Sequence, residues 1–146
     1  ALMAYLVRDE FPDADMDKVI LMCLIHDLGE AFTGDIPTFL KTGEDEKKEE
    51  ELLTGWIQSF PEPFRSDMLS LYKEMADRTT LEARIFKAMD SLEAVIQHNE
   101  SHISTWAENE YELNLTYGND KAAFSPYLTH LRQAIREETL RKMEEA

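Results

Sequence analysis

Apolar residues recur along this chain at the spacing that is typical of α-helices. The segment from Val19 to Ile25 is apolar on nearly every side, which predicts a central helix that is buried all round and runs to about Ala31. Asp15 or Asp17 stands where the N-cap of that helix is expected. No alternation of apolar and polar residues is long enough to build a sheet, so the pattern predicts an all-α fold.

A second long helix is expected to begin at Thr79 or Thr80. Apolar residues then fall on one side of it, at Leu81, Ile85, Ala88, Met89, Leu92, Val95 and Ile96. A last helix is expected after Ser125, with Pro126 at its first position. Further helices are expected over about 1–9, 44–57 and 64–75. No repeat or linker divides the chain, so we expect one domain over residues 1–146.

The charged run from Glu44 to Glu51 is expected to form a solvated helix face. In an alternative interpretation, Lys47 or Lys48 lies near an anionic substrate.

The composition narrows the class of protein. Hydrophobic residues make up 43% of the 146 residues, which is enough for a core, and 5 Gly and 5 Pro leave room for long helices. The net charge of −15 disfavours binding to a nucleic-acid duplex, whereas a bound cation would still permit a small phosphate ligand. The one cysteine, Cys23, is expected to be a small buried hydrophobe in a cytoplasmic protein, and no apolar stretch is long enough to cross a membrane.

Candidate chemistry is concentrated at the C-terminal end of the central, most apolar helix. His26 and Asp27 are adjacent there, and Glu30 follows His26 at helical spacing, so the three polar groups are expected near one another. Burying them together is costly unless a divalent cation compensates the carboxylates and binds the neutral imidazole. Gly29 removes a side chain and is expected to leave room for a ligand. A His-Asp pair alone is weak evidence, because such pairs occur by chance and histidines at helix ends are commonly structural.

Two blocks of sequence resemble the nucleotidase-like branch of the HD-domain phosphohydrolases. The first is His26-Asp27-Leu28-Gly29-Glu30 followed by Thr33-Gly34-Asp35-Ile36-Pro37, and the second is Lys87-Ala88-Met89-Asp90-Ser91-Leu92-Glu93-Ala94. The resemblance implies a helical HD-domain bundle in which His26, Asp27 and Asp90 hold a divalent metal ion (Mn, Co, Fe, Ni, Zn or Mg). It also implies catalytic importance for Glu30 and Asp35. We expect Glu30 to orient or deprotonate a metal-bound water, and Asp35 to relay a proton or hold the nucleophile.

The family pattern begins with a histidine that this chain lacks. It is expected a few residues before Ala1, in a helix of which Ala1–Val7 looks like the second half. The later histidines His98, His102 and His130 are expected to be mainly structural or exposed, with His98 as a candidate for shaping the pocket.

The resemblance implies hydrolysis of a (deoxy)nucleoside 5′-monophosphate to nucleoside and phosphate, by a homodimer. Two alternatives remain open: hydrolysis of another phosphorylated nucleotide, such as an alarmone or a cyclic nucleotide, and a non-catalytic helical binding module. Without the resemblance, Asp35 is equally well a turn residue. Asp90 would then be a helix carboxylate that pairs with Lys87 or Arg84.

Overall fold

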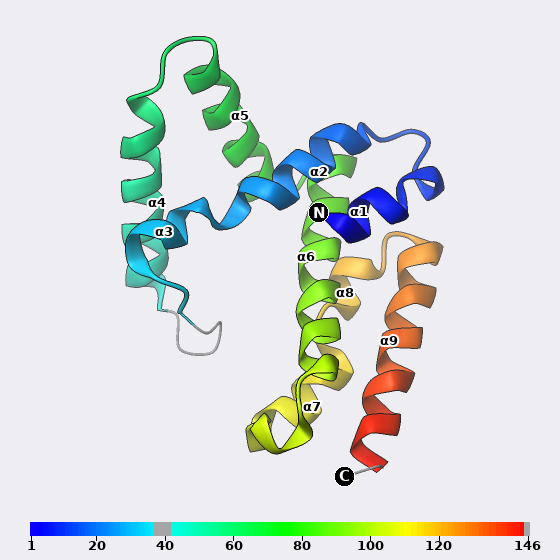
Figure 1. Ribbon diagram of the computed structural model, residues 1–146. Helices are drawn as coiled ribbons and strands as arrows, with labels where there is room; N and C mark the ends of the chain where they lie inside the picture. The colour runs from blue at the N-terminus through cyan, green and yellow to red at the C-terminus, as the bar shows by residue number, and fades with distance from the viewer. Residues whose placement is uncertain (37–41, 145–146) are drawn as a thin grey trace.

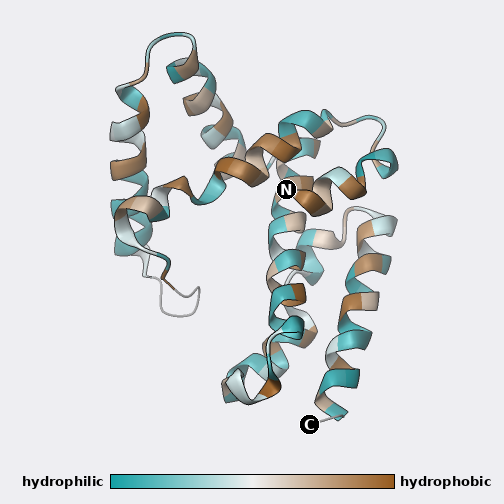
Figure 2. Ribbon diagram, in the orientation of Figure 1, coloured by the Kyte–Doolittle hydropathy of each residue, from teal (hydrophilic) through white to brown (hydrophobic). Residues whose placement is uncertain are grey.

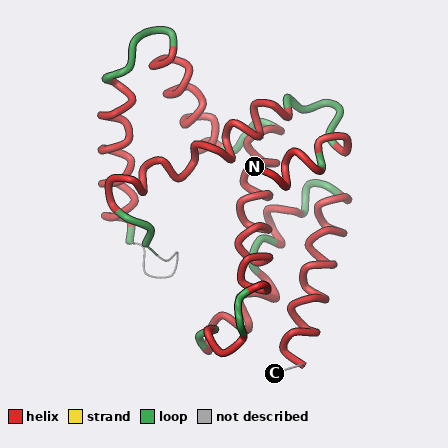
Figure 3. Tube along the Cα trace, viewed as in Figure 1, coloured by secondary structure: helices red, strands yellow, loops and turns green. Residues whose placement is uncertain are grey.

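The computed structural model of the chain describes residues 1–36 and 42–144 (Figure 1). Its elements, in chain order, are α1 (Leu2–Leu6), η1 (Arg8–Glu10), α2 (Met16–Ile25), η2 (His26–Gly29), α3 (Glu30–Thr33), α4 (Gly43–Gln58), α5 (Phe64–Asp77), α6 (Leu81–Glu100), η3 (Ile103–Thr105), α7 (Glu108–Thr116), α8 (Asn119–Ala122) and α9 (Pro126–Glu144). Figure 3 shows helices and loops, and no strand, in the described part of the chain, which confirms the all-α prediction.

Helix α6 contacts helices α1, α2, α5, α8 and α9 and is the centre of the core. It begins after Thr80, as one of the two expected starts, because the Thr80 hydroxyl oxygen accepts a hydrogen bond of 3.2 Å from the Ala83 amide. Helices α2 and α9 pack against it (Figure 1). The core therefore combines residues of α6 with apolar residues of its two neighbours: Ala83, Ile85, Phe86, Ala88, Met89, Leu92 and Val95 of α6, Val19 and Met22 of α2, and Leu128 and Ile135 of α9.

Helix α2 is capped by Asp15, whose carboxylate accepts a hydrogen bond of 3.1 Å from the Lys18 amide. Only one face of the helix is buried, and Val19 and Met22 lie on it. On the other side, Leu21 is 47% exposed and Leu24 is 64% exposed, although Figure 2 colours most of the helix hydrophobic. The prediction of a helix buried all round was therefore wrong.

The α-helical hydrogen-bonding pattern ends at Ile25 rather than near Ala31. Residues His26–Gly29 form the 3₁₀ turn η2, and a short α3 follows. The hydroxyl of Tyr72, on α5, donates a hydrogen bond to the carbonyl oxygen of Ile25. We attribute the break to this contact, because it occupies the last carbonyl of α2 from outside the helix. His26 and Asp27 consequently lie on a tighter turn, with a different spacing of side chains from that of an α-helix.

Helices α4 and α5 form an arm beside the end of α2 (Figure 1). The side chain of Glu49, on α4, packs against the backbone of η2 so closely that a Cβ atom on Gly29 would lie 2.6 Å from its Cγ. Because Gly29 has no side chain, α4 can pack closely against η2 at this point. The expectation that Gly29 leaves space for a ligand was therefore wrong.

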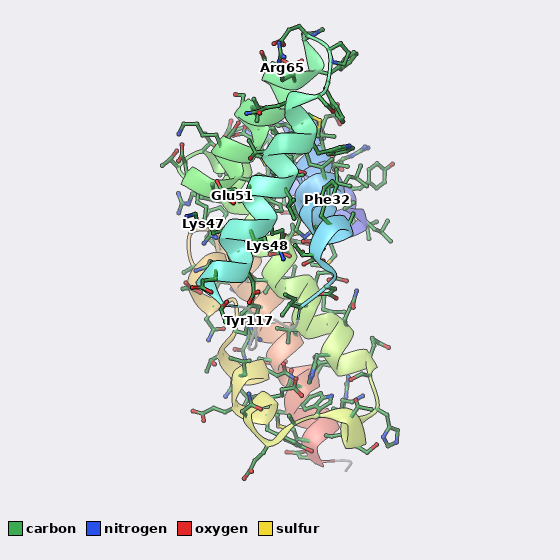
Figure 4. All side chains as sticks on the ribbon, turned by 90° about the vertical axis from the view of Figure 1, so that its left-hand side faces the viewer. Phe32, Lys47, Lys48, Glu51, Arg65 and Tyr117 are labelled. Carbon is green, nitrogen blue, oxygen red and sulfur yellow. The ribbon has the colours of Figure 1, made fainter. Side chains whose placement is uncertain are left out.

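The outer surface of α4 faces solvent, as the charged run predicted. Lys47 and Glu51 are labelled in Figure 4; they are 76% and 68% exposed at the side chain, and their charged atoms lie 3.8 Å apart. Separately, none of the described helices combines the length and the apolar character that a membrane span requires.

Candidate metal centre

Three predicted metal ligands, two on η2 and one on α6, lie close together. The Nε2 atom of His26 lies 3.0 Å from Oδ2 of Asp27 and 3.2 Å from Oδ1 of Asp90. His26 and Asp27 come from η2, and Asp90 comes from the middle of α6. The packing of α2 on α6 thus brings together the two blocks of sequence that were singled out separately.

The other imidazole nitrogen fixes the orientation of the His26 ring. Its Nδ1 lies 3.1 Å from the carbonyl oxygen of Cys23, to which it is placed to donate a hydrogen bond. The ring also packs edge-on against Phe86, with 5.4 Å between ring centroids. A backbone partner on Nδ1 leaves Nε2 to face the carboxylates, which is the arrangement usual for a metal-binding histidine.

The charge states of His26 and Asp90 depend on each other and on their neighbours. Burial opposes a charge on His26, but the hydrogen bonds and negative charges of Asp27 and Asp90 outweigh it and raise the pKa of His26 to about 10. Burial likewise opposes ionisation of Asp90, yet His26 and Lys87 lower the pKa of Asp90 to about 2. Without a metal, the cluster is therefore an imidazolium between two carboxylates.

Lys87 is the second cation beside Asp90. Its Nζ lies 2.6 Å from Oδ2 of Asp90, one turn along α6, and both side chains are about one quarter exposed. Oδ2 of Asp90 therefore pairs with Lys87, while Oδ1 of the same carboxylate contacts His26. The guanidinium of Arg84, the other partner considered for Asp90, lies instead over the ring of Phe124 at 4.3 Å.

The donor set fits a divalent cation. At metal–ligand distances of about 2.1 Å, two neighbouring donors of an octahedral site lie about 3.0 Å apart. The distances of 3.0 and 3.2 Å from Nε2 to the two carboxylates are of this size. In the described ranges, 1–36 and 42–144, no group of three or more His, Cys, Asp or Glu side chains is already arranged as a metal site. The His26 imidazole contacts both carboxylates directly. Metal binding therefore requires that the imidazole lose its proton and that the three side chains separate slightly.

Two cavities flank His26. One, of about 530 Å³, lies between the end of α2, α4 and α5, and several carboxylates line it, including Glu46, Glu49, Glu50 and Asp77. The other, of about 550 Å³, lies between α1, α2 and α6. Of the two, this second cavity is lined by His26, Asp27 and Asp90 together. The rest of its wall is mostly apolar, with one further carboxylate, and includes Leu2, Met3, Leu6, Met89, Glu93 and Ile96.

The two predicted catalytic carboxylates follow the cluster in the chain. Glu30 begins α3 and is half-buried, and Asp35 is exposed in the loop that follows α3. The contacts described above join His26, Asp27, Asp90 and Lys87, and the roles of Glu30 and Asp35 stay predictions. The last residue of the first motif, Pro37, lies outside the described residues.

The later histidines lie elsewhere. His98 contacts α7, with Nε2 3.3 Å from Oε2 of Glu110 and its ring over Trp106. It lines a separate cavity of about 140 Å³ and does not line either cavity beside His26. The Nδ1 of His102 accepts a hydrogen bond from the Ser104 amide and caps η3. These contacts give His98 and His102 structural roles.

Sequence reasoning missed the function of Tyr72. The sequence predicts a helix over about 64–75, which includes Tyr72, but its pattern does not indicate that the Tyr72 hydroxyl donates to the carbonyl of Ile25, next to His26. Burial, and then the charge of Asp27, raise the pKa of Tyr72 to about 12, so it remains a donor at ordinary pH. The hydroxyl of a tyrosine on a packing face needs a hydrogen-bond partner, and this general requirement was the one signal of the contact that the sequence offered.

Comparison with known proteins agrees with the resemblance of the two sequence blocks to HD-domain proteins. A family model of the HD domain matches residues 1–132. The human 5′-deoxynucleotidase HDDC2 is 29% identical over 102 residues, which cover 68% of this chain and 49% of the human protein. The mouse protein of the same name is 31% identical over 102 residues, covering 68% of this chain and 50% of its own. The 5′-deoxynucleotidase YBR242W of Saccharomyces cerevisiae is 26% identical over 103 residues, covering 66% and 42%.

The chain spans about half the length of the curated relatives it matches. No solved structure matches it.

Proposed function

The chain belongs to the HD-domain family, and from this premise we propose that it is a metal-dependent phosphohydrolase that converts (deoxy)nucleoside 5′-monophosphates to nucleosides and phosphate. The observation that carries the proposal is the position of His26 Nε2, within 3.2 Å of carboxylate oxygens from both Asp27 and Asp90. The names of the relatives, 5′-deoxynucleotidases, support the choice of substrate.

In the proposed enzyme, His26, Asp27 and Asp90 hold a divalent metal ion. When bound, such an ion lowers the pKa of a coordinated water and neutralises phosphate oxygens. The chain's own part is to present a neutral imidazole, oriented through Nδ1 by the Cys23 carbonyl, and to hold Asp90 ionised beside Lys87. The donor set includes imidazole and carboxylates, which suits Mn, Fe, Co, Ni or Zn better than calcium, and Mg remains a further candidate.

We place the nucleotide in the cavity between α1, α2 and α6. This cavity contains all three ligands, and its wall of leucine and methionine side chains offers an apolar surface to a nucleobase. The cavity on the α4 side contains only His26 of the three ligands, and its carboxylates, from α4 and Asp77, outnumber its lysine, Lys73, so it would repel a phosphate. Glu30 orients or deprotonates the attacking water, and Asp35 relays its proton or holds the nucleophile, as the family resemblance implies.

We also infer a cytoplasmic homodimer. Adjoining helices α1 and α2 leave large apolar side chains exposed: Leu2 at 71%, Leu6 at 70% and Leu24 at 64%. Contact with a second copy would cover this surface. The single thiol, Cys23, is half-buried and unpaired, which suits a reducing compartment.

The reaction is tested by a substrate panel with the full-length protein, each candidate metal being added in turn. Nucleoside 5′-monophosphates should release orthophosphate, whereas an alarmone substrate would release pyrophosphate instead. Asp90→Asn should abolish the release. Asp77→Asn is a matched control, because Asp77 also pairs with a lysine of its own helix but lines the other cavity. Equal turnover by wild type and Asp90→Asn would exclude the proposed centre.

A further inference from the structure

The arginines of this chain fall into two groups. Three of them pair with carboxylates: Arg8 with Asp9, Arg65 with Glu62, and Arg141 with Glu138. The other four form no ion pair within the described part of the chain, and these are Arg78, Arg84, Arg132 and Arg136. In a protein with 30 acidic and 15 basic residues, an arginine without a carboxylate is unexpected.

All four unpaired arginines line two adjoining hollows beside α8, which packs between α6 and α9 (Figure 1). The first hollow, of about 420 Å³, is lined by Arg78 and Arg84 together with Lys87 and Lys121. The second, of about 430 Å³, is lined by Arg132 and Arg136. Ala123 borders both hollows, and we call the two together the arginine hollows.

Few negative charges compensate this surface. Asp120 is the single carboxylate among the residues that line the first hollow, and it is paired with Lys121. The residues that line the second hollow include His130 and no carboxylate. The described arginine hollows therefore carry an excess of positive charge on a strongly acidic protein.

Arg132 contributes a largely buried positive charge beside the second hollow. It is only 3% exposed, its Nε donates to the Tyr117 carbonyl and its Nη2 donates to the Asn114 carbonyl, each at 2.8 Å. The remaining Nη1 is buried without a hydrogen-bond partner among the described residues. A buried guanidinium nitrogen that lacks a partner is costly. Burial, and then the positive charge of Arg136, lower the pKa of Arg132.

We propose that the arginine hollows bind a small phosphorylated anion at a site separate from the metal centre. The planar guanidinium matches phosphate oxygens in pairs, and four unpaired arginines suit a ligand with more than one negative charge. The volumes are those of a small-molecule pocket. An extended polyanion is disfavoured, because the net charge of −15 would repel it beyond the hollows.

The site is distinct from the cavities beside His26. No residue lines both the arginine hollows and either of those cavities. Lys87 is the point of contact between the two regions, since it lines the first hollow and pairs with Asp90.

Inorganic pyrophosphate is the probe for this proposal, titrated into the full-length protein by calorimetry in the presence of a chelator. Removal of metal prevents phosphate from binding at the metal centre, so the result does not depend on the proposed enzymatic activity. We expect saturable binding with a Kd below about 1 mM. Arg84→Gln and Arg136→Gln should each weaken the binding about tenfold or more, because each removes a charge-assisted donor. Both side chains are at least partly exposed, so these variants should fold.

The matched control is Arg141→Gln, on α9 like Arg136 but paired with Glu138 outside the hollows. It should bind pyrophosphate as the wild type does. The proposal is overturned if the wild type shows no saturable binding, if Arg141→Gln weakens it as much as Arg136→Gln, or if citrate binds as tightly at the same residues.

Discussion

Nε2 of His26 and Oδ1 of Asp90 lie 3.2 Å apart, although the two residues belong to different helices and are distant in the sequence. Their contact depends on the packing of α2 against α6, where Val19 and Met22 enter the core. The side chain of Asp27 completes the cluster from the solvent side, since it is 61% exposed. The core thus positions one ligand pair, His26 and Asp90, whereas the third ligand, Asp27, lies on the exposed side.

Substitution of Asp90 by Asn should lower both metal affinity and phosphohydrolase activity. A carboxylate that would bind the metal directly is lost, so the affinity should fall by more than the roughly 10–100-fold that removal of an outer-shell partner costs. Calorimetric titration with Mn²⁺ measures the change, and Asp77→Asn serves again as the control. An affinity within about twofold of wild type would contradict the assignment of Asp90.

The metal-free protein should lose stability as the pH rises from about 6.5 to about 10. The pKa of His26 is raised from its usual 6.5 to about 10, so the folded state holds its proton more tightly than the unfolded state. The resulting stabilisation is complete below the unfolded pKa and disappears as the pH passes the folded pKa. Urea unfolding at several pH values, compared with His26→Gln, measures this contribution. A wild type and variant with parallel pH profiles would show that the imidazolium is not held in this way.

Metal affinity should show the opposite trend and increase over the same pH range. The imidazole must lose its proton before Nε2 can bind a cation, and that proton is held by Asp27 and Asp90. Titration of one metal at pH 6, 7 and 8 measures the trend, in a buffer that does not bind the metal. An affinity that is independent of pH would mean that His26 is not a ligand.

Tyr72→Phe should destabilise the fold by about 1 kcal/mol, because the Ile25 carbonyl loses its hydrogen-bond donor. Metal affinity should also fall, since His26 directly follows that carbonyl. Tyr127→Phe is the matched control, a half-buried tyrosine whose ring packs edge-on against Phe11. Chemical denaturation gives the stability change; equal effects of the two variants would remove the special role of Tyr72.

Gly29→Ala should destabilise the protein by about 1 kcal/mol, because the new Cβ would lie 2.6 Å from Cγ of Glu49. The backbone of Gly29 is right-handed, with φ of −61°, so alanine is otherwise acceptable there. Truncation of Glu49 to Ala in the same chain should then recover stability. Thermal unfolding of the single and double variants measures the coupling, and additive effects would contradict the steric account.

The sequence predicted the features that depend on local patterns. The start of α6 at Thr80 followed from its cap and its apolar stripe, and the His26-Asp27 pair was recognisable as a dipeptide at a helix end. Asp90 was identified through the family resemblance, and no local signal linked it to His26. The structure supplies that link through the packing of two helices.

Features that depend on long-range contacts were not predictable. The end of α2 at Ile25 is tied to a hydroxyl of α5, and the role of Gly29 depends on a side chain of α4. The exposure of Leu24 also differed from its hydropathy. Similarly, the carbonyls of Asn114, on α7, and of Tyr117, which follows α7, hold the Arg132 side chain. No local pattern in the sequence therefore indicated the arginine hollows.

Metal content of the purified full-length protein tests the central claim most directly. We predict that the wild type retains a divalent metal, that His26→Ala and Asp90→Ala lose it, and that His102→Ala, whose imidazole only caps η3, retains it. Full metal content in both His26→Ala and Asp90→Ala would contradict the account.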